Sequence, residues 1–185
     1  RGYDYYAVTD HGEGPGVFGD IALDGEALEE QAEAIADVAE DASIEVLHGV
    51  EANIAADGSI APDDDVLEPL DIVVASPHAG LDADPEAATE RLVAPSSTRQ
   101  LTFSGTRLIN SRPGLSPNMA AVAEVAAREG VAIEVNANPA RLDADDTAVR
   151  AAVDAGATIV VDTDAHAPGE LDNARYGVHT ARLGW

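Results

Sequence analysis

Residues 71–78 read Asp-Ile-Val-Val-Ala-Ser-Pro-His, and this stretch indicates the class of fold. Four consecutive apolar residues are typical of a short strand that is buried on both faces, as in a parallel sheet covered by helices. The stretch then turns polar and ends on His78. A buried strand that ends in a potential ligand predicts an α/β domain whose site lies at the carboxyl ends of its strands.

Alternating strands and helices extend from this stretch in both directions. Runs of β-branched, aromatic and other apolar residues predict further strands at residues 3–9, 44–51, 131–135 and 158–161. Four helices are predicted between the strands. Three have expected N-caps, at Asp24, at Asp84 before Pro85 and at Ser116 before Pro117, and the fourth is expected near 145–155. Gly130 and Gly156 each stand between a helix and a strand, as left-handed C-caps do.

The length and the ends of the chain also carry expectations. The 185 residues suit a single domain. Arg1-Gly2 before a strand has the form of the two other glycine junctions with the helix missing, which predicts that the protein extends further toward its N-terminus. No apolar stretch approaches the roughly 20 residues of a membrane span, and no secretory signal precedes the first strand. We therefore expect a cytoplasmic protein with no membrane partner.

The composition is strongly acidic, with 35 Asp and Glu against 10 basic residues, all arginine, for a net charge of −25. The acidic residues are spread along the whole chain instead of forming one tail. Repulsion of this size destabilises a compact state unless salt screens it, and at about 1 M salt the Debye length is about 3 Å. We favour adaptation to molar salt over a basic binding partner, because it reconciles an anionic substrate with the lack of a basic face.

Polar side chains that bind metals follow several of the predicted strands. The chain contains no cysteine, so a metal would be bound by histidine and carboxylate, which suits Zn²⁺, Mn²⁺ or Fe²⁺. Strand ends carry Thr9-Asp10-His11, Gly49-Val50-Glu51, Ser76-Pro77-His78, Glu134-Val135-Asn136 and the segment from Asp162 to His166. Each residue alone has another explanation as a helix cap or a core residue, and it is their repetition that predicts a metal centre. His48, within a strand, and His179, in a terminal segment without clear register, are left out of it.

These motifs, in this order, resemble the PHP (polymerase and histidinol phosphatase) family. The stretches 107–114, 134–142 and 176–185 resemble more narrowly the PHP domain at the C-terminal end of bacterial and archaeal family X DNA polymerases, and the acidic composition points to a haloarchaeal source. The resemblance covers nearly the whole chain. It implies a distorted seven-stranded, TIM-like β/α barrel with a site for up to three divalent ions, Mn²⁺ or Zn²⁺.

The resemblance also assigns roles to individual residues. It implies that the metal ligands are His11, Glu51, His78, Asp164 and His166, and that Asp10 is a further ligand or orients His11. Three arginines are candidate phosphate or DNA contacts, because guanidinium groups match phosphate oxygens: Arg107, Arg112 and Arg141. Structural ion pairs with the abundant carboxylates are an equally good explanation for all three.

Two departures from the family pattern affect the expected activity. The His-x-His motif of the first family strand is absent, as expected if an N-terminal piece is missing. A Gly-His-Pro motif is also absent, since residues 94–106 show neither strand character nor histidine. Synonymous codons for this segment, read from the third nucleotide, encode a helix end, a strand and Gly-His. We therefore hypothesise that residues 95–106 are frameshifted.

The resemblance thus implies a metal-dependent phosphoesterase domain that acts on DNA 3′ ends as the exonuclease or 3′-end-processing part of a family X repair polymerase. One alternative is a stand-alone phosphomonoesterase of the histidinol phosphatase kind. A second is a degenerate structural domain without activity, favoured by the two missing motifs. The sequence indicates no oligomeric state.

Overall fold

The computed structural model describes residues 2–17, 21–94, 101–104 and 114–185, and of residues 101–104 only the backbone. Its centre is a seven-stranded sheet in which six strands follow the order β1-β2-β4-β5-β6-β7 and β3 pairs with β2. All pairs along this order are parallel, and only the β2–β3 pair is antiparallel. The strands are β1 (Tyr5–His11), β2 (Glu45–Ile54), β3 (Ile60–Ala61), β4 (Ile72–Ser76), β5 (Leu101–Ser104), β6 (Ala132–Asn136) and β7 (Thr158–Asp162).

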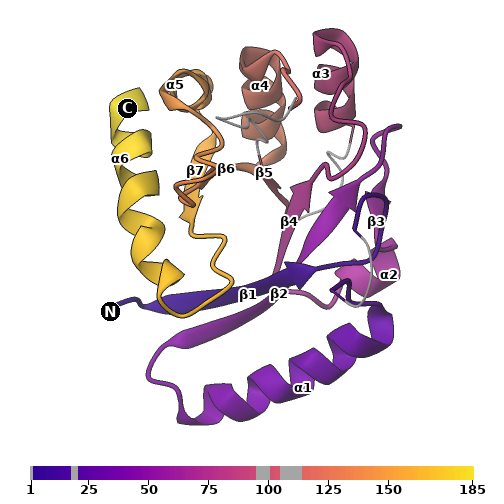
Figure 1. Cartoon of the computed structure of the whole chain (residues 1–185), viewed down its shortest axis with the longest axis vertical. Coiled ribbons are helices and arrows are strands. Elements are labelled where there is room, and N and C mark those ends of the chain that lie inside the picture. The colour runs from indigo at the N-terminus through magenta and orange to yellow at the C-terminus, as the bar shows by residue number, and fades with distance from the viewer. Residues whose placement is uncertain (1, 18–20, 95–100, 105–113) are drawn as a thin grey trace.

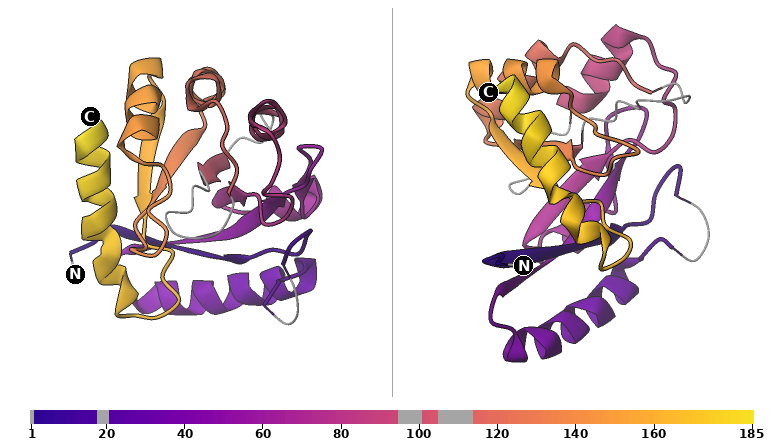
Figure 2. Two further views of the ribbon diagram at one scale, coloured as in Figure 1. Left: turned by 45° about the horizontal axis from the view of Figure 1, so that its top comes forward. Right: turned by 60° about the vertical axis from the view of Figure 1, so that its left-hand side comes forward.

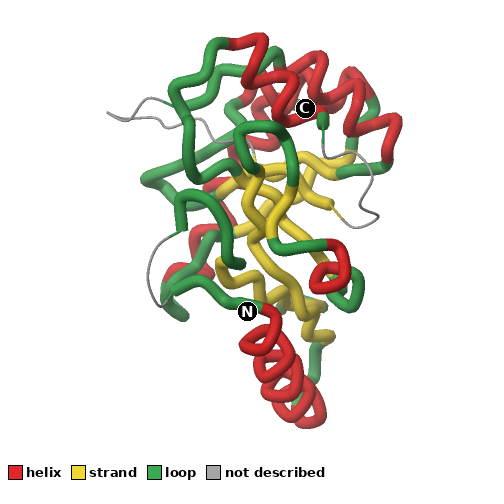
Figure 3. The backbone as a smooth tube through the Cα atoms, turned by 90° about the vertical axis from the view of Figure 1, so that its right-hand side faces the viewer, coloured by secondary structure: helices red, strands yellow, loops and turns green. Residues whose placement is uncertain are grey.

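Helices lie outside the sheet, and those that precede β7 connect its strands. They are α1 (Gly25–Asp41), α2 (Asp64–Leu67), α3 (Pro85–Val93), α4 (Met119–Glu129), α5 (Asp146–Ala155), the 3₁₀ helix η1 (Glu170–Asn173) and α6 (Ala174–Gly184). Helix α1 runs along β1 and β2, whereas α3, α4, α5 and α6 form a row around the other strands (Figure 1). The two views of Figure 2 show the sheet curving between α1 and this row. Figure 3 shows the strands in the middle of the molecule with helices on the outside.

Local sequence signals define most helix ends. Asp24, Asp84 and Asp145 are N-caps whose carboxylates accept backbone N–H bonds, and the first two were predicted. Gly130 and Gly156 are left-handed C-caps, as predicted. The prediction that Ser116 caps α4 is wrong. The cap is Asn118, whose side-chain oxygen accepts from the Ala121 N–H at 3.3 Å, so Pro117 precedes the cap instead of following it.

Apolar side chains from both sides of the sheet form one core. Val50, Val73, Ile133 and Val135 are nearly inaccessible to solvent on the central strands. The helices add small residues such as Ala123, Ala126 and Ala152, which let the helices pack close to the sheet. Burial of a Val or Leu side chain contributes about 1.5–3 kcal/mol each, so this core stabilises the fold in which the site is held.

The expected closed barrel is not shown. Within the described residues, strand pairing runs from β1 to β7 without joining these two end strands, so the sheet is curved but open. The structure shows a mixed α/β fold with a parallel sheet. A cavity of about 690 Å³ is lined by residues of both end strands, β1 and β7, and by residues of β2, β4 and β6.

The prediction of no strand between α3 and α4 is wrong, because Leu101–Ser104 forms β5 and pairs with both β4 and β6. Pairing with β4 and β6 makes this segment a strand, although its local sequence does not indicate one. Most of the segment proposed to be frameshifted, residues 95–100 and 105–106, lies outside the described residues. The sequence interpretation also missed β3, α2, η1 and α6, and α6 contains His179.

No helix in the described part of the chain is long and apolar enough to cross a membrane.

Candidate metal centre

Three neighbouring strands bring His11, Glu51 and His78 together. His11 is the last residue of β1 and lies beside Glu51 in the parallel register of β1 and β2. β2 also pairs with β4, and His78 follows the end of β4 by two residues. Because parallel strands present their carboxyl ends at one edge, hydrogen bonding of β1, β2 and β4 is sufficient to assemble the three side chains.

The three side chains are close enough to share one ion. His11 Nδ1 lies 3.1 Å from Glu51 Oε2, and His78 Nε2 lies 3.2 Å from Glu51 Oε1. The two imidazoles meet edge to face with ring centroids 5.1 Å apart. One potential ligand atom from each residue falls within a group no more than 4.8 Å across. Each side chain is less than a third exposed.

The contacts within this group fit a bound cation. His11 Nδ1 is buried and makes no hydrogen bond within the described residues, although a carboxylate oxygen lies 3.1 Å away. His78 Nδ1 is buried without a hydrogen-bond partner in the same part of the chain. Ligand atoms about 2.0–2.2 Å from one Zn²⁺ in tetrahedral geometry are roughly 3.3–3.6 Å apart, close to the separations observed. His11, Glu51 and His78 therefore fit a divalent metal.

The electrostatic environment keeps Glu51 ionised. Burial alone would raise its pKa, but the hydrogen bond from His78 and the charges of His78, His11 and Arg141 together lower the pKa below its ordinary value. A carboxylate that is ionised at neutral pH is the form that binds a metal.

On the other side of the cavity, Asp164 follows the end of β7 and is held by neighbouring donors. Its Oδ2 accepts hydrogen bonds from the Asn136 amide at 3.2 Å and from Arg141 Nη1 at 3.5 Å. Its backbone lies in the left-handed region, with φ at 47°. His166 Nδ1 lies 3.7 Å from Oδ1 of the same carboxylate. One oxygen is thus occupied by protein donors, and the other faces His166.

His166 follows β7 and is an exposed neighbour of Asp164. Its side chain is 68% exposed. Its Nδ1 lies 2.9 Å from the Asp164 carbonyl oxygen, and its backbone N–H donates to Glu170 Oε2 at 2.7 Å. Within the described residues, neither Asp164 nor His166 is part of the compact His11, Glu51, His78 group.

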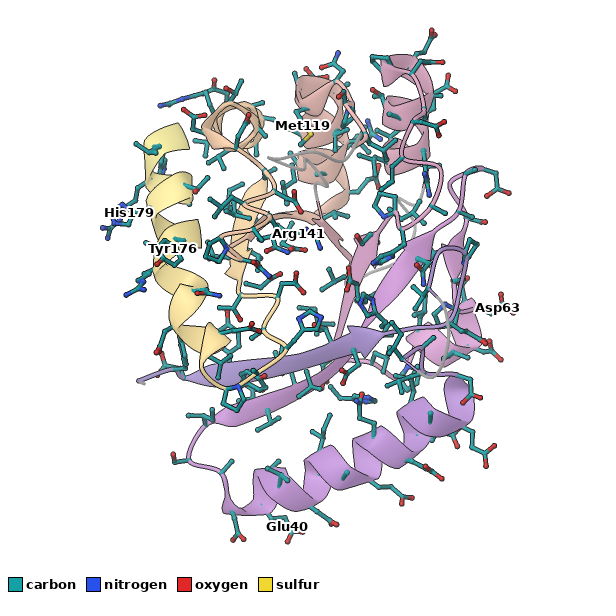
Figure 4. The ribbon with its side chains drawn as sticks, in the orientation of Figure 1. Glu40, Asp63, Met119, Arg141, Tyr176 and His179 are labelled. Carbon is teal, nitrogen blue, oxygen red and sulfur yellow. The ribbon has the colours of Figure 1, made fainter. Side chains whose placement is uncertain are left out.

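Arg141 carries positive charge toward this side of the site from the loop between β6 and α5 (Figure 4). Its Nε donates to Asp143 Oδ2 at 2.8 Å, and Nη1 reaches Asp164. Burial would lower its pKa, but the nearby charges of Asp143, Asp164 and Glu51 raise it, so the guanidinium stays charged. The sequence gives Arg141 two explanations, a phosphate contact and a structural ion pair. Both remain open, since an ion-paired guanidinium can also contact phosphate.

A buried carboxyl pair lies below Asp164. Glu134 on β6 is 3% exposed and shares a side-chain hydrogen bond with Asp162 at the end of β7. Burial and the charges of Asp164 and Glu51 raise the pKa of Asp162 to about 6, although the hydrogen bond to Glu134 opposes the shift. One proton shared by the pair would explain how two carboxyl groups are accommodated together.

Asp10 and His48 lie on the opposite face of the sheet from His11 and Glu51, because side chains alternate along a strand. Asp10 Oδ2 accepts from Gln31 Nε2 on α1 at 2.6 Å. Gln31 Oε1 lies 3.2 Å from His48 Nε2. The amide of Gln31 thus bridges β1 and β2 from the α1 side. Arg107 and Arg112, the two other predicted phosphate contacts, lie outside the described residues.

Sequence reasoning did not select Asp143, Asp162 or Glu134 as site residues. Glu134 and Asp162 were noted only as polar residues near strand ends. Glu134 and Asp162 both lie near the carboxyl end of a buried strand, and the rule that functional polar residues gather there could have identified them. Asp143 carries no such signal, because it lies in a turn where aspartate is common for conformational reasons.

The chain is similar to known proteins in sequence and in fold. It is 36% identical, over 189 aligned positions and all of its length, to the protein named DNA polymerase/3′-5′ exonuclease PolX of Bacillus subtilis (strain 168). The chain spans about 33% of the length of that relative. No model of a protein family matches the chain.

A solved structure shares the fold. Histidinol phosphate phosphatase from Lactococcus lactis, complexed with zinc, L-histidinol and phosphate, matches with a TM-score of 0.58 at 14% identity. The match covers 97% of this chain and 82% of the phosphatase. At this identity the comparison establishes a shared fold only.

Proposed function

We propose that the chain is a metal-dependent phosphoesterase domain of the PHP type, and that it trims or processes DNA 3′ ends as part of a family X repair polymerase. The observation that carries the proposal is the convergence of His11, Glu51 and His78 with ligand atoms inside 4.8 Å. The 36% identity to a protein named as both polymerase and 3′-5′ exonuclease supports the DNA substrate.

The positions of the side chains suggest which residues would bind the metal ions. His11, Glu51 and His78 would hold a first Zn²⁺ or Mn²⁺, and Asp164 and His166 would contribute to further positions, up to three in all. Asp10 would orient His11 through the strand they share. When bound, such ions polarise phosphoryl oxygens and lower the pKa of water.

The chain's own groups would orient the substrate. Arg141 keeps its charge and presents Nη1 toward Asp164, where a phosphate would find a guanidinium donor. Arg107 and Arg112 are proposed as further DNA contacts. The acidic pair of Glu134 and Asp162 would limit how much negative charge the cavity accepts without a metal.

The finer fold is also part of the proposal. We infer that one more strand completes a distorted seven-stranded, TIM-like barrel between β1 and β7. The inference is supported by the open sheet and by the cavity that both end strands line.

The acidic surface is proposed to be an adaptation to molar salt. The net charge of −25 without a single lysine supports this interpretation. The melting temperature in KCl between about 0.1 M and about 3 M is expected to rise with salt, since screening removes self-repulsion. A melting temperature that does not rise would favour a basic partner instead.

The activity test uses the full chain loaded with Zn²⁺ or Mn²⁺, a 5′-labelled DNA duplex with a 3′ overhang, and histidinol phosphate as a second substrate. Metal-dependent shortening from the 3′ end is expected, and Glu51→Gln should abolish it. Arg128→Gln is the matched control, because Arg128 is mostly exposed and pairs with Glu129 at the end of α4.

The alternatives give different results in the same test. Hydrolysis of histidinol phosphate with intact DNA would support the stand-alone phosphatase, for which the shared fold is the supporting observation. Binding of metal without hydrolysis of either substrate would support a non-catalytic domain.

A further inference from the structure

The loop between β6 and α5 is built around a fully buried carboxylate. Asp143 is 0% exposed, and its Oδ2 accepts from Arg141 Nε at 2.8 Å. The carbonyl oxygen of Asp143 also accepts from the Asn136 N–H at the end of β6. Asp143 therefore connects the loop to the strand through its backbone and to Arg141 through its side chain.

The backbone of this loop is strained on both sides of Asp143. Leu142 has φ of 49° and Ala144 has φ of 59°. Within the described residues, the only other non-glycine residue with positive φ is Asp164, which accepts the other end of Arg141. Strained positions of this kind persist only where surrounding contacts hold them, and they gather at functional sites.

Asn136 makes further hydrogen bonds that hold this loop. Its side-chain oxygen accepts from the Asn138 N–H at 2.9 Å, and its amide nitrogen donates to Asp164 Oδ2 at 3.2 Å. The loop is thus fixed at its start by Asn138, at its end by Asp143, and across the site by Asp164. The guanidinium is held at Nε, which leaves its Nη edge directed toward Asp164.

We propose that Asp143 is a positioning residue that holds Arg141 by Nε, so that the Nη edge serves as the phosphate-binding edge of the site. Asp143 itself does not contact phosphate and acts through Arg141. The phosphate part of this proposal rests on the proposed function, whereas the positioning part rests on the loop alone.

The first test observes the hydrogen bond directly. In ¹H–¹⁵N spectra the Nε–H of Arg141, identified by its loss in Arg141→Lys, should exchange slowly because it donates to a buried carboxylate. Asp143→Asn should remove that protection while backbone signals of β6 and β7 stay in place. Protection that survives Asp143→Asn overturns the proposal.

The second test is a double-mutant cycle on binding of inorganic phosphate, followed by the amide signals of residues 164–166. Asp143→Asn and Arg141→Gln should each weaken phosphate binding about tenfold, as loss of an outer-shell partner typically does. The double variant should bind no more weakly than Arg141→Gln alone. Arg150→Gln is the control, because Arg150 contacts the Trp185 carbonyl away from the site.

These outcomes test separately the positioning role of Asp143 and the phosphate-binding role of Arg141. Additive losses in the cycle would show that Asp143 acts independently of Arg141, and would overturn the positioning role. If wild type binds no phosphate while the Nε–H behaves as expected, positioning is supported and the phosphoesterase proposal fails. If Asp143→Asn does not fold, comparison of Arg141→Lys with Arg141→Gln decides. Lysine keeps the charge but cannot be held by Nε, so recovery of phosphate binding by lysine overturns the proposal.

Discussion

The two sides of the cavity present their polar groups in different ways. On the β1–β2–β4 side, Glu51 is surrounded by the imidazoles of His11 and His78, and the three contact one another directly. On the β6–β7 side, Asp164 is held by the guanidinium of Arg141 and the amide of Asn136. The carboxylate of the first side contacts two imidazoles, whereas the carboxylate of the second side contacts a guanidinium that stays charged.

Strand pairing explains this difference. β1, β2 and β4 are consecutive in the sheet, so backbone hydrogen bonds alone set the distance between their terminal side chains. Within the described residues, β7 lies at the other end of the same open sheet, and both end strands line the cavity. A metal site can therefore form on the paired side without closure of the barrel, whereas the β7 side relies on its loop for order.

Glu51→Gln should have the largest effect on metal binding. The substitution removes the charge between His11 and His78 while keeping the size of the side chain. Loss of a direct ligand should weaken Zn²⁺ or Mn²⁺ binding by more than about 100-fold, since loss of an outer-shell partner alone costs about 10–100-fold. Isothermal titration of the metal into the purified chain measures this.

Asp164→Asn is the comparison that makes the result decisive. Asp164 already has protein donors on one oxygen, so its loss should weaken the first metal by about tenfold or less. Equal losses in the two variants would mean that one ion is shared across the cavity, and the distinction between the two sides would be wrong.

The pH dependence of the free energy of unfolding should reveal the raised pKa of Asp162 on the β6–β7 side. The pKa of Asp162 is raised to about 6 in the folded state, chiefly by burial, from an ordinary value of 3.8. Between these values the folded state binds more protons than the unfolded state, so this group lowers stability as pH rises from about 4 to about 6. The loss is on the order of 2–3 kcal/mol and should be absent in Asp162→Asn.

Urea unfolding with EDTA at several pH values measures this effect as the difference between wild type and Asp162→Asn. The pKa of Glu51 is lowered, so its contribution has the opposite sign: it is present above the ordinary pKa and is lost as pH falls through the folded pKa. Asp57→Asn is a control at an exposed carboxylate, whose pKa Ser59 lowers by hydrogen bonds. The prediction would be contradicted if the free energy of unfolding changed with pH in the same way in wild type and in Asp162→Asn.

Gly49→Ala should disturb the paired side at its closest approach. A Cβ on Gly49 would lie 2.4 Å from the Ile72 carbonyl oxygen on β4 and 3.1 Å from Thr9 on β1. Overpacking of this kind typically costs about 1–3 kcal/mol, which chemical denaturation measures. Gly169→Ala, where a Cβ meets nothing within 4 Å, is the matched control and should leave stability unchanged. A Gly49→Ala protein as stable as this control would show that β2 and β4 can move apart freely.

Local signals in the sequence predicted the helix ends capped by Asp24 and Asp84 and the strands with uninterrupted apolar runs. They could not predict β5, because Leu101–Ser104 is a strand through its pairing with β4 and β6, which are distant in sequence. The start of α4 was misplaced because Ser-Pro and Asn are both acceptable caps, and the Asn118 contact with Thr89 Oγ1 depends on the packing of α3.

The site was predictable where strand ends carry it and unpredictable where a turn does. His11, Glu51 and His78 follow from the rule that polar residues after parallel strands meet at one edge. Whether Arg141 is paired or available could not be read from spacing, because the answer depends on the strained backbone around Asp143. The face of the sheet to which Asp10 points follows from alternation, but its partner Gln31 is visible only once α1 is placed.

The smallest effect is expected for Gln31→Ala, which tests whether the α1 face of the sheet influences the metal face. Gln31 bridges Asp10 and His48, so its loss should lower the free energy of unfolding by about 1 kcal/mol, the usual net value of a hydrogen bond. Metal affinity should fall by less than about tenfold, since Asp10 reaches His11 only through the backbone of β1. The neighbouring surface substitution Glu30→Ala serves as control. A loss of metal affinity well above tenfold would show that the Asp10–Gln31 contact orients His11, and that the paired side depends on α1 as well as on strand register.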